Sequence, residues 1–192
     1  MGVAERKSRE RAQRERRIVT TAREIAARDG WSAVTIRRLA DEIEYSQPVL
    51  YSHFANREAI VGAVAVEGFG ELATVLWQAG RPSSEREQAL HSVADAYLAF
   101  ARAHPALYEA MFTMPAGLHF ADKETRPELR DAFAALAAVV TSPESGEETA
   151  TRTETLWATL HGLAELERSG RIRPGARDER LALVADVLFA AG

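Results

Sequence analysis

The stretch from residue 35 to residue 60, TIRRLADEIEYSQPVLYSHFANREAI, gathers side chains that can bind a nucleic acid. The Gln47 amide can hydrogen-bond adenine through both its donor and its acceptor, and Pro48 can make apolar contact with a thymine methyl group. Tyr51 and His53 can donate hydrogen bonds to phosphate oxygens. The chemistry that these residues offer is therefore recognition of bases and of a phosphate backbone.

Further candidates lie where short helices are predicted to begin. Thr35 combines a hydroxyl group with outward-facing backbone N–H groups, which suits a phosphate oxygen, and Arg57 places a charge at a later helix start. Arg37 or Arg38 can contact the backbone or a guanine edge. Ser46 joins this set as a polar group at the start of the second helix. Each has an alternative interpretation without DNA, because Thr35 and Ser46 are good helix caps and arginines can simply be solvated.

Apolar spacing predicts the helices that hold these side chains. Apolar residues at offsets of 0, 3, 4 and 7 give a helix over 36–43, with Thr35 as its N-cap. Ser46 caps a second helix with Pro48 in its first turn, so the Ser46 hydroxyl can reach only the Val49 N–H. Two short helices joined by a tight turn are the smallest device that presents one helix to a DNA groove.

Helical spacing continues along the whole chain, and alternating strand patterns do not occur. We therefore predict an all-α protein of about nine helices. Asn56 is a third cap, Ser83 or Ser84 a fourth, and Gly30 stands where a left-handed residue would end the first helix. The predicted helices cover about 4–29, 36–43, 46–54, 56–77, 84–103, 106–112, 127–140, 147–169 and 177–190.

The charge distribution divides the chain into two predicted domains. Residues 1–57 hold 12 Lys and Arg against 8 Asp and Glu, whereas residues 58–192 hold 12 against 20. A basic end on an acidic body favours a polyanion-binding module joined to a part with another task, although a solvated basic tail would give the same charge. We expect a DNA-binding domain over 1–57 and a larger helical domain over 58–192.

Composition narrows the class of protein further. The chain is 46% hydrophobic and 27% charged, as in ordinary soluble globular proteins. It contains no cysteine, which excludes disulfides and thiolate metal sites. We expect no apolar run long enough to span a bilayer and no secretory signal, so the predicted location is the cytoplasm.

From Ile18 to Ile60 the sequence resembles the N-terminal domain of the TetR family of transcriptional regulators. The matching elements keep the family's spacing without a gap: Ala22 to Ala27, Gly30-Trp31, Thr35-Ile36, Leu39-Ala40, Leu50-Tyr51, His53-Phe54 and Arg57-Glu58. One position departs from the family pattern, because the turn between the two short helices usually carries Gly and here carries Glu44. A left-handed Glu44 would cost ~1–2 kcal/mol.

The resemblance implies a role for each matched position. Thr35, Tyr51 and His53 match positions that contact phosphates. Gln47 and Pro48 occupy variable positions of the recognition helix, which tune the sequence that is read.

The basic side chains receive roles in the same way. Arg57 stands where a Lys often contacts phosphate, and Arg37 matches a position that sometimes reaches a base. The Arg-rich leader from Arg6 to Arg17 can follow the minor groove or the backbone, or can remain a solvated arm.

The acidic body contains aromatic and apolar groups, most of them expected in the core, that can line a cavity for a small apolar molecule. The candidate ligand-binding residues are Trp77, Tyr97, Phe100, Tyr108, Met111, Phe112, Phe120, Trp157 and His161. The segments 104–112 and 157–167 resemble the C-terminal ligand-binding domain of a TetR subgroup marked by Trp and His-Gly, here Trp157 and His161-Gly162. Trp157 and His161 share a helix face and can equally be a packed pair.

The resemblance also implies that the last two helices form a four-helix dimer interface about a two-fold axis. The apolar residues predicted for it are Leu156, Leu160, Leu163, Leu181, Val184 and Leu188. Two recognition helices can read a palindrome in adjacent major-groove faces. A ligand would then act by favouring a dimer state whose recognition helices are wrongly spaced for DNA.

Two other classes of protein are alternatives. An enzyme would need a nucleophile with a base, paired carboxylates or a phosphate loop, and the best pair available, His161 with Glu165, is ordinary. A helical protein-interaction module could keep the helix pair without using DNA, but the basic excess of residues 1–57 argues against it. We predict no cofactor, no metal site and no membrane partner.

Overall fold

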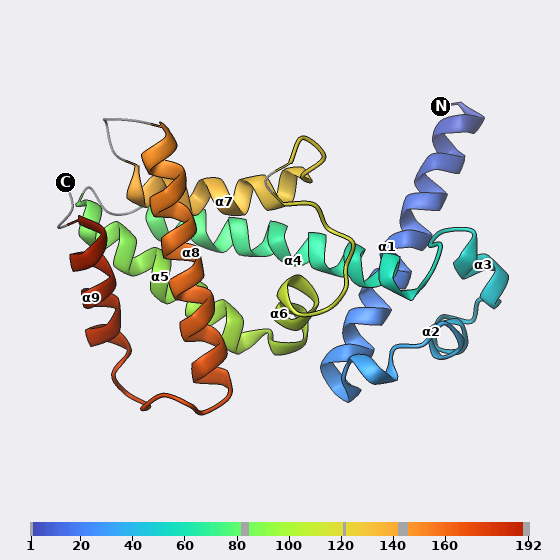
Figure 1. Ribbon diagram of the computed structural model, residues 1–192. Coiled ribbons are helices and arrows are strands. Elements are labelled where there is room, and N and C mark those ends of the chain that lie inside the picture. The colour runs from blue at the N-terminus through green and yellow to red at the C-terminus, as the bar shows by residue number, and fades with distance from the viewer. Residues whose placement is uncertain (1, 82–84, 121, 142–145, 190–192) are drawn as a thin grey trace. The chain divides into compact units, whose positions relative to one another are not determined.

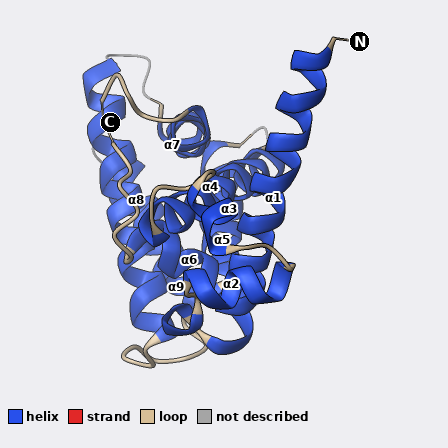
Figure 2. Ribbon diagram, turned by 90° about the vertical axis from the view of Figure 1, so that its right-hand side faces the viewer, coloured by secondary structure: helices blue, strands red, loops and turns tan. Residues whose placement is uncertain are grey.

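The computed structural model describes residues 2–81, 85–120, 122–141 and 146–189. These residues form nine α-helices and one short 3-10 helix, and no strand occurs among them (Figures 1 and 2). The prediction of an all-α protein of about nine helices is therefore confirmed. Ser83 and Ser84, predicted to cap a helix, lie outside the described residues.

The chain folds into two compact units. The first unit comprises Met1–Gly68 and His104–Glu124, and the second comprises Phe69–Ala103 and Thr125–Gly192. The chain thus leaves the first unit within α4 (Arg57–Gly80), returns before α6 (Pro105–Phe112) and leaves again before α7 (Pro127–Val140). These units describe packing, and the division of functions between 1–57 and 58–192 stays a prediction.

The first unit is built on α1, a helix of 27 residues. Its described elements are α1 (Val3–Asp29), η1 (Trp31–Ala33), α2 (Ile36–Ile43), α3 (Gln47–Tyr51), the first half of α4, and α6. The apolar stripe of α1 is fully buried at Ile18, Ala22 and Ile25. The helix α1 contacts α2, which in turn contacts α3, and Leu39 of α2 and Leu50 of α3 are fully buried as well. The helix pair is therefore anchored to α1 through α2.

The packing of α6 against α1 was not predicted from the sequence. The indole N–H of Trp31 donates a hydrogen bond of 2.7 Å to the carbonyl oxygen of Ala106, at the start of α6. On α4, a Cβ added to Gly62 would lie 2.5 Å from the carbonyl oxygen of Ala116. Only glycine allows that approach, so α6 and the segment after it close the first unit.

The second unit contains the rest of α4, α5 (Arg86–Ala103), α7 (Pro127–Val140), α8 (Gly146–Arg168) and α9 (Arg177–Phe189). The helix α5 contacts α7, α8 and α9. Its Leu90 and Leu98 are buried together with Leu156 and Leu160 of α8 and Leu181 of α9. One face of each surrounding helix is therefore used inside the chain.

The helix α4 corrects one expectation. Among the described residues it is long and apolar enough to cross a membrane, with a mean hydropathy of 1.7 over its best window. Within the protein, 61% of that window is buried. A core helix of a soluble protein has the same composition, and burial in two compact units accounts for the apolar run.

The predicted caps can be compared bond by bond. The Thr35 hydroxyl accepts the Arg38 N–H at 3.1 Å, and the Asn56 side chain accepts the Ala59 N–H at 2.8 Å, so both caps are confirmed. Ser46 is the residue before α3, but its hydroxyl makes no capping bond. The Val49 N–H instead donates to the Ser46 backbone carbonyl at 2.9 Å, which leaves no proton for the hydroxyl.

The turn between α2 and α3 contains the departure from the family pattern. Glu44 has φ 59° and ψ 38°, and it is the one non-glycine residue with positive φ in the described part of the chain. The Tyr45 N–H donates to the Ala40 carbonyl at 2.9 Å, the six-to-one bond of a Schellman motif. The turn thus keeps the geometry that suits glycine, at a cost of ~1–2 kcal/mol.

Candidate nucleic-acid interface

The short helix α3 presents one polar and aromatic face to solvent. Gln47 and Pro48 are exposed, and Tyr51, one turn later, is 54% exposed. Leu50 points the other way and is fully buried. The anchor at Leu50 therefore orients Gln47, Pro48 and Tyr51 outward, as the apolar spacing predicted.

The start of α2 adds a second exposed group of side chains. Thr35 is exposed, and its hydroxyl proton can still donate while its oxygen caps the helix. The Arg37 side chain is 84% exposed, and its guanidinium lies 4.0 Å from Asp41. Arg38 is instead hydrogen-bonded to Asp29 of α1, and this bond, with one from Arg28, lowers the pKa of Asp29. Of the two arginines, Arg37 is the one directed to solvent.

A polar network that sequence reasoning missed ties α1 to the end of α3. The His53 side chain is only 5% exposed, and its Nδ1 lies 3.2 Å from Oε1 of Glu15. The same carboxylate oxygen accepts the Arg11 Nε–H at 2.9 Å, and Arg11 also donates to the Ser52 carbonyl at 3.3 Å. We call Arg11, Glu15, Ser52 and His53 the α1–α3 latch.

The other end of α3 is also held by α1. The guanidinium carbon of Arg17 lies 5.4 Å from the centroid of the Tyr45 ring, within cation–π range. Tyr45 is half-buried just before α3, and it was not among the predicted site residues. Side chains of α1 therefore reach the residues before and after α3.

Arg57 has partners inside the protein. Its Nε–H donates to the Val34 carbonyl at 2.7 Å, and its Nη2 donates to the Trp31 carbonyl at 2.6 Å. Both carbonyls belong to the turn around η1, which precedes α2. The guanidinium thus fixes the entry to the helix pair, and only its remaining N–H groups are left for a phosphate.

The Arg-rich leader is part of α1. The helix begins at Val3, and its residues from Val3 to Arg11 are all exposed. Arg6 lies 3.7 Å from Glu10, a solvent-exposed pair. The first turns of α1 are therefore basic and exposed, and they belong to the same helix that supplies Arg11 and Glu15 to the α1–α3 latch.

The nine candidate ligand-binding residues are divided between the two compact units. The first unit holds Tyr108, Met111, Phe112 and Phe120, and the second holds Trp77, Tyr97, Phe100, Trp157 and His161. Tyr97 and Tyr108 are buried, and the rings of Tyr108 and Phe112 lie 4.6 Å apart at 48°. Trp77 and Phe120 are exposed instead. The ligand-binding role of this set stays a prediction.

His161 occupies a half-buried position on α8. Burial lowers the pKa of His161, and the nearby charge of Glu165 acts in the opposite direction. Burial at this position therefore favours the neutral imidazole. Trp157, one turn earlier, is also half-buried.

Four of the six residues predicted for a dimer interface are covered by the chain itself. Leu156, Leu160, Leu181 and Leu188 are buried, while Leu163 and Val184 are half-buried. The physical reason is that α8 and α9 both pack on α5, so the longest apolar stripe of each helix serves the internal core.

The exposed apolar groups of α8 and α9 lie at other positions. Leu183 is 63% exposed and Val187 is 70% exposed, one turn apart on α9, and Leu166 of α8 is also exposed. In the sequence these residues form a second apolar stripe, offset from the stripe that is buried, and this second stripe is the pattern that could have identified them.

A salt-bridge cluster fixes α9 on α8. Arg177 and Arg180 both donate to Glu167, at 3.0 Å for Arg180, and Arg177 also reaches Asp95 of α5 at 3.3 Å. Burial alone would raise the pKa of Glu167, but hydrogen bonds from Arg177 and Arg180 outweigh it and lower that pKa. The surface that α9 presents to solvent is therefore well defined.

Comparisons with known proteins agree with this arrangement. The family model described as "Bacterial regulatory proteins, tetR family" matches residues 18–64, and the one described as "Tetracyclin repressor-like, C-terminal domain" matches residues 90–188. The chain belongs to the TetR family of transcriptional regulators. The family assignment makes it a DNA-binding regulator of transcription rather than an enzyme, and its place in the Trp-His-Gly subgroup stays a prediction.

Individual relatives support the family assignment. The chain is 32% identical over 154 residues to the HTH-type transcriptional regulator Rv0681 of Mycobacterium tuberculosis, covering 80% of this chain and 69% of the relative. The fold is similar to that of BioQ with its double-stranded DNA operator, with a TM-score of 0.67, 21% identity, and 92% and 98% of the two chains covered. It is also similar to TetR-Q116A of Acinetobacter baumannii AYE in complex with minocycline, with a TM-score of 0.65, 17% identity, and 91% and 93% covered.

Proposed function

We propose that this TetR-family regulator is a repressor that binds a palindromic operator as a homodimer and is released by a small apolar molecule. The observation that carries the DNA part is the face of α3, where Gln47, Pro48 and Tyr51 are exposed while Leu50 is buried. A major groove admits a helix with such a face. The similar fold of BioQ was solved with its DNA operator, which supports the same use here.

Each exposed residue receives a role in this proposal. Gln47 and Pro48 read bases, while Thr35 and Tyr51 donate to phosphates. Arg37, on the exposed side of α2, reaches the backbone or a base edge, and the exposed arginines of the first turns of α1 add phosphate contacts.

The partly buried members of the predicted site act differently. His53 and Arg57 mainly position the helix pair, because their polar groups are bonded to α1 and to the η1 turn. Arg38 does the same through Asp29. Ser46 can contact a phosphate with the hydroxyl that it does not use as a cap.

The homodimer is proposed to form through the exposed apolar stripe of α8 and α9. Leu183 and Val187, with Leu166, leave apolar area in water that a second copy would cover. A two-fold axis makes this surface self-complementary and places two α3 helices on one palindrome. The half-buried Leu163 and Val184 can extend the contact.

The effector is proposed to be a small apolar molecule, and the place of action is the cytoplasm, without a membrane partner. The similar fold solved in complex with minocycline supports a small-molecule ligand as a class. Tyr97, Trp157 and His161 are the candidate ligand contacts in the second unit, and Tyr108 is a candidate in the first. The ligand would act by shifting the population of dimer states, and it needs different affinities for those states.

DNA binding is tested with the DNA upstream of the protein's own gene, labelled and titrated at 50 mM and 200 mM salt. The proposal expects tight binding at low salt and a loss of about 10³-fold or more at 200 mM if six or more phosphates are contacted. An unrelated duplex of equal length is the control. Absence of binding at both salt concentrations would favour the alternative, a helical interaction module that does not use DNA.

A further inference from the structure

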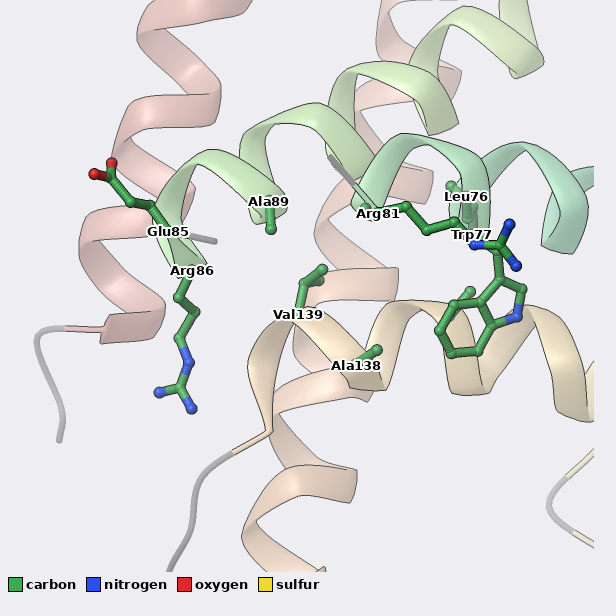
Figure 3. A pocket seen from close by; sticks show the side chains of 10 residues that line it. Leu76, Trp77, Arg81, Glu85, Arg86, Ala89, Ala138 and Val139 are labelled. Atoms are coloured by element: carbon green, nitrogen blue, oxygen red, sulfur yellow. The ribbon is translucent and has the colours of Figure 1, made fainter. Parts of the chain in front are cut away.

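The second unit contains an open groove with an apolar floor. The groove has a volume of about 390 Å³ and lies among the end of α4, the start of α5 and the end of α7 (Figure 3). Leu76, Ala89, Ala135 and Val139 line it and are buried side chains of these three helices. A ligand in the groove would therefore rest on an apolar surface that already exists.

The two ends of the groove carry aromatic and charged groups. Figure 3 shows Trp77 and Arg81 at one end and Glu85 and Arg86 at the other. The indole of Trp77 is 40% exposed although it borders the apolar floor. Arg86 donates a hydrogen bond to the carbonyl of Thr141, which ties it to the end of α7.

The hollow continues past Trp77. A neighbouring hollow of about 480 Å³ is lined by Thr74, Trp77, Gln78 and Arg81. Trp77, in the last turn of α4, and Arg81, directly after the end of α4, therefore face both spaces. A ligand can lie across the indole while its polar group stays near the Arg81 guanidinium.

The charges around the groove select among amphipathic ligands. Among the described residues that line the groove, Arg81 and Arg86 outnumber Glu85, so an anionic head group is favoured over a cationic one. Arg86 is committed to the Thr141 carbonyl, and its guanidinium contributes charge rather than a first hydrogen bond. A planar guanidinium such as that of Arg81 matches a carboxylate through two parallel hydrogen bonds.

We propose that this groove binds a carboxylate that carries a hydrocarbon chain. The carboxylate group pairs with Arg81, and the hydrocarbon chain lies on Trp77 and the apolar floor. Small-molecule sites begin at about 300 Å³, so the groove suits a medium-length chain such as octanoate. Of the nine candidate ligand-binding residues, only Trp77 lines this groove. The binding requires neither DNA nor the effector of the proposed function, and it is measured on the free protein.

The head-group selection is tested by calorimetric titration of the full chain with octanoate, octanol and octylammonium. Octanoate is expected to bind most tightly and octylammonium most weakly. Decanoate should bind up to about fourfold more tightly than octanoate for each added methylene that the groove covers. The proposal is overturned if octanoate does not bind, or if octylammonium binds as tightly as octanoate.

The site is tested with matched variants. Arg81→Gln should weaken octanoate binding about two- to fivefold, the effect of a partly exposed ion pair. Arg102→Gln removes an exposed arginine of α5 outside the groove and should leave octanoate affinity unchanged. Equal affinity of Arg81→Gln and the unaltered protein would overturn the assignment of the head group.

Filling the groove gives an independent test of its location. Ala138 is exposed and lines the groove, so Ala138→Trp adds bulk there without overpacking the core. This variant should unfold at the same Tm as the unaltered protein and should no longer bind octanoate. If Ala138→Trp does not fold, Trp77→Ala replaces it, and weaker octanoate binding is again expected because the apolar contact is removed. Octanoate affinity that is unchanged in the folded variant would show that the ligand binds elsewhere.

Discussion

Arg57 offers the sharpest contrast between a role read from sequence and a role read from structure. Its guanidinium donates to the Val34 and Trp31 carbonyls at 2.7 and 2.6 Å. Arg57→Met keeps the aliphatic stem and removes both bonds. Hydrogen bonds from a charged donor contribute about 1.5–3 kcal/mol each, and partial exposure places these at the lower end. The free energy of unfolding should therefore fall by about 2–3 kcal/mol.

Thermal unfolding in the absence of DNA measures this loss. A chain of this length loses about 2–4 °C of Tm per kcal/mol, so Arg57→Met should unfold about 5–10 °C below the unaltered protein. Arg37→Met is the matched control, because Arg37 is 84% exposed and reaches only Asp41 at 4.0 Å. The Tm of Arg37→Met should equal that of the unaltered protein.

DNA titrations of the same two variants complete the test. At a temperature where both are folded, Arg37→Met should weaken DNA binding if Arg37 faces the operator. A Tm of Arg57→Met equal to that of the unaltered protein, together with weaker DNA binding, would refute the structural role and restore Arg57 as chiefly a phosphate contact.

Two further predictions concern the second unit. Burial lowers the pKa of His161, so the unfolded chain binds this proton more tightly than the folded protein, and stability should fall as the pH drops below the ordinary value of 6.5. His161→Gln should lessen the loss of unfolding free energy between pH 7.5 and pH 5.5 in urea titrations, and an unchanged pH dependence would show that other groups cause it. Val187→Glu places a charge on the proposed dimer surface and should halve the mass measured by light scattering, whereas Val3→Glu, at another exposed valine, should not. A dimer that survives Val187→Glu would have its interface elsewhere.

Most of the helices could be predicted from short-range features of the sequence. Caps at Thr35 and Asn56 and the apolar spacing of α2 depend on residues within one or two turns, so they are readable from the sequence. The same applies to the burial of Leu50, which fixes the outward face of α3. The Ser46 cap failed because a backbone carbonyl competed for the same N–H, and spacing does not reveal that competition.

Contacts between residues far apart in the chain could not be predicted from the sequence. The bond between Glu15 and His53 spans 38 residues, and that between Trp31 and Ala106 spans 75. No periodicity links such positions, so the sequence predicts a phosphate contact at His53 without revealing that its side chain lies mostly covered beside Glu15. The predicted dimer residues met a related limit, because α8 and α9 carry two apolar stripes and spacing alone does not tell which stripe the chain covers itself. The dimer interface therefore stays a prediction.

The measurement that tests the proposed DNA reading most directly compares Gln47→Ala with Tyr51→Phe on an operator and on its single-base-pair variants. Gln47→Ala should remove about 1–3 kcal/mol of discrimination at one base pair of each half-site and leave the other positions unchanged. Tyr51→Phe should lower the affinity for every variant by the same factor, because a phosphate contact carries no sequence information. If Gln47→Ala lowers all affinities equally, or changes none, α3 does not read bases through the face that this structure presents.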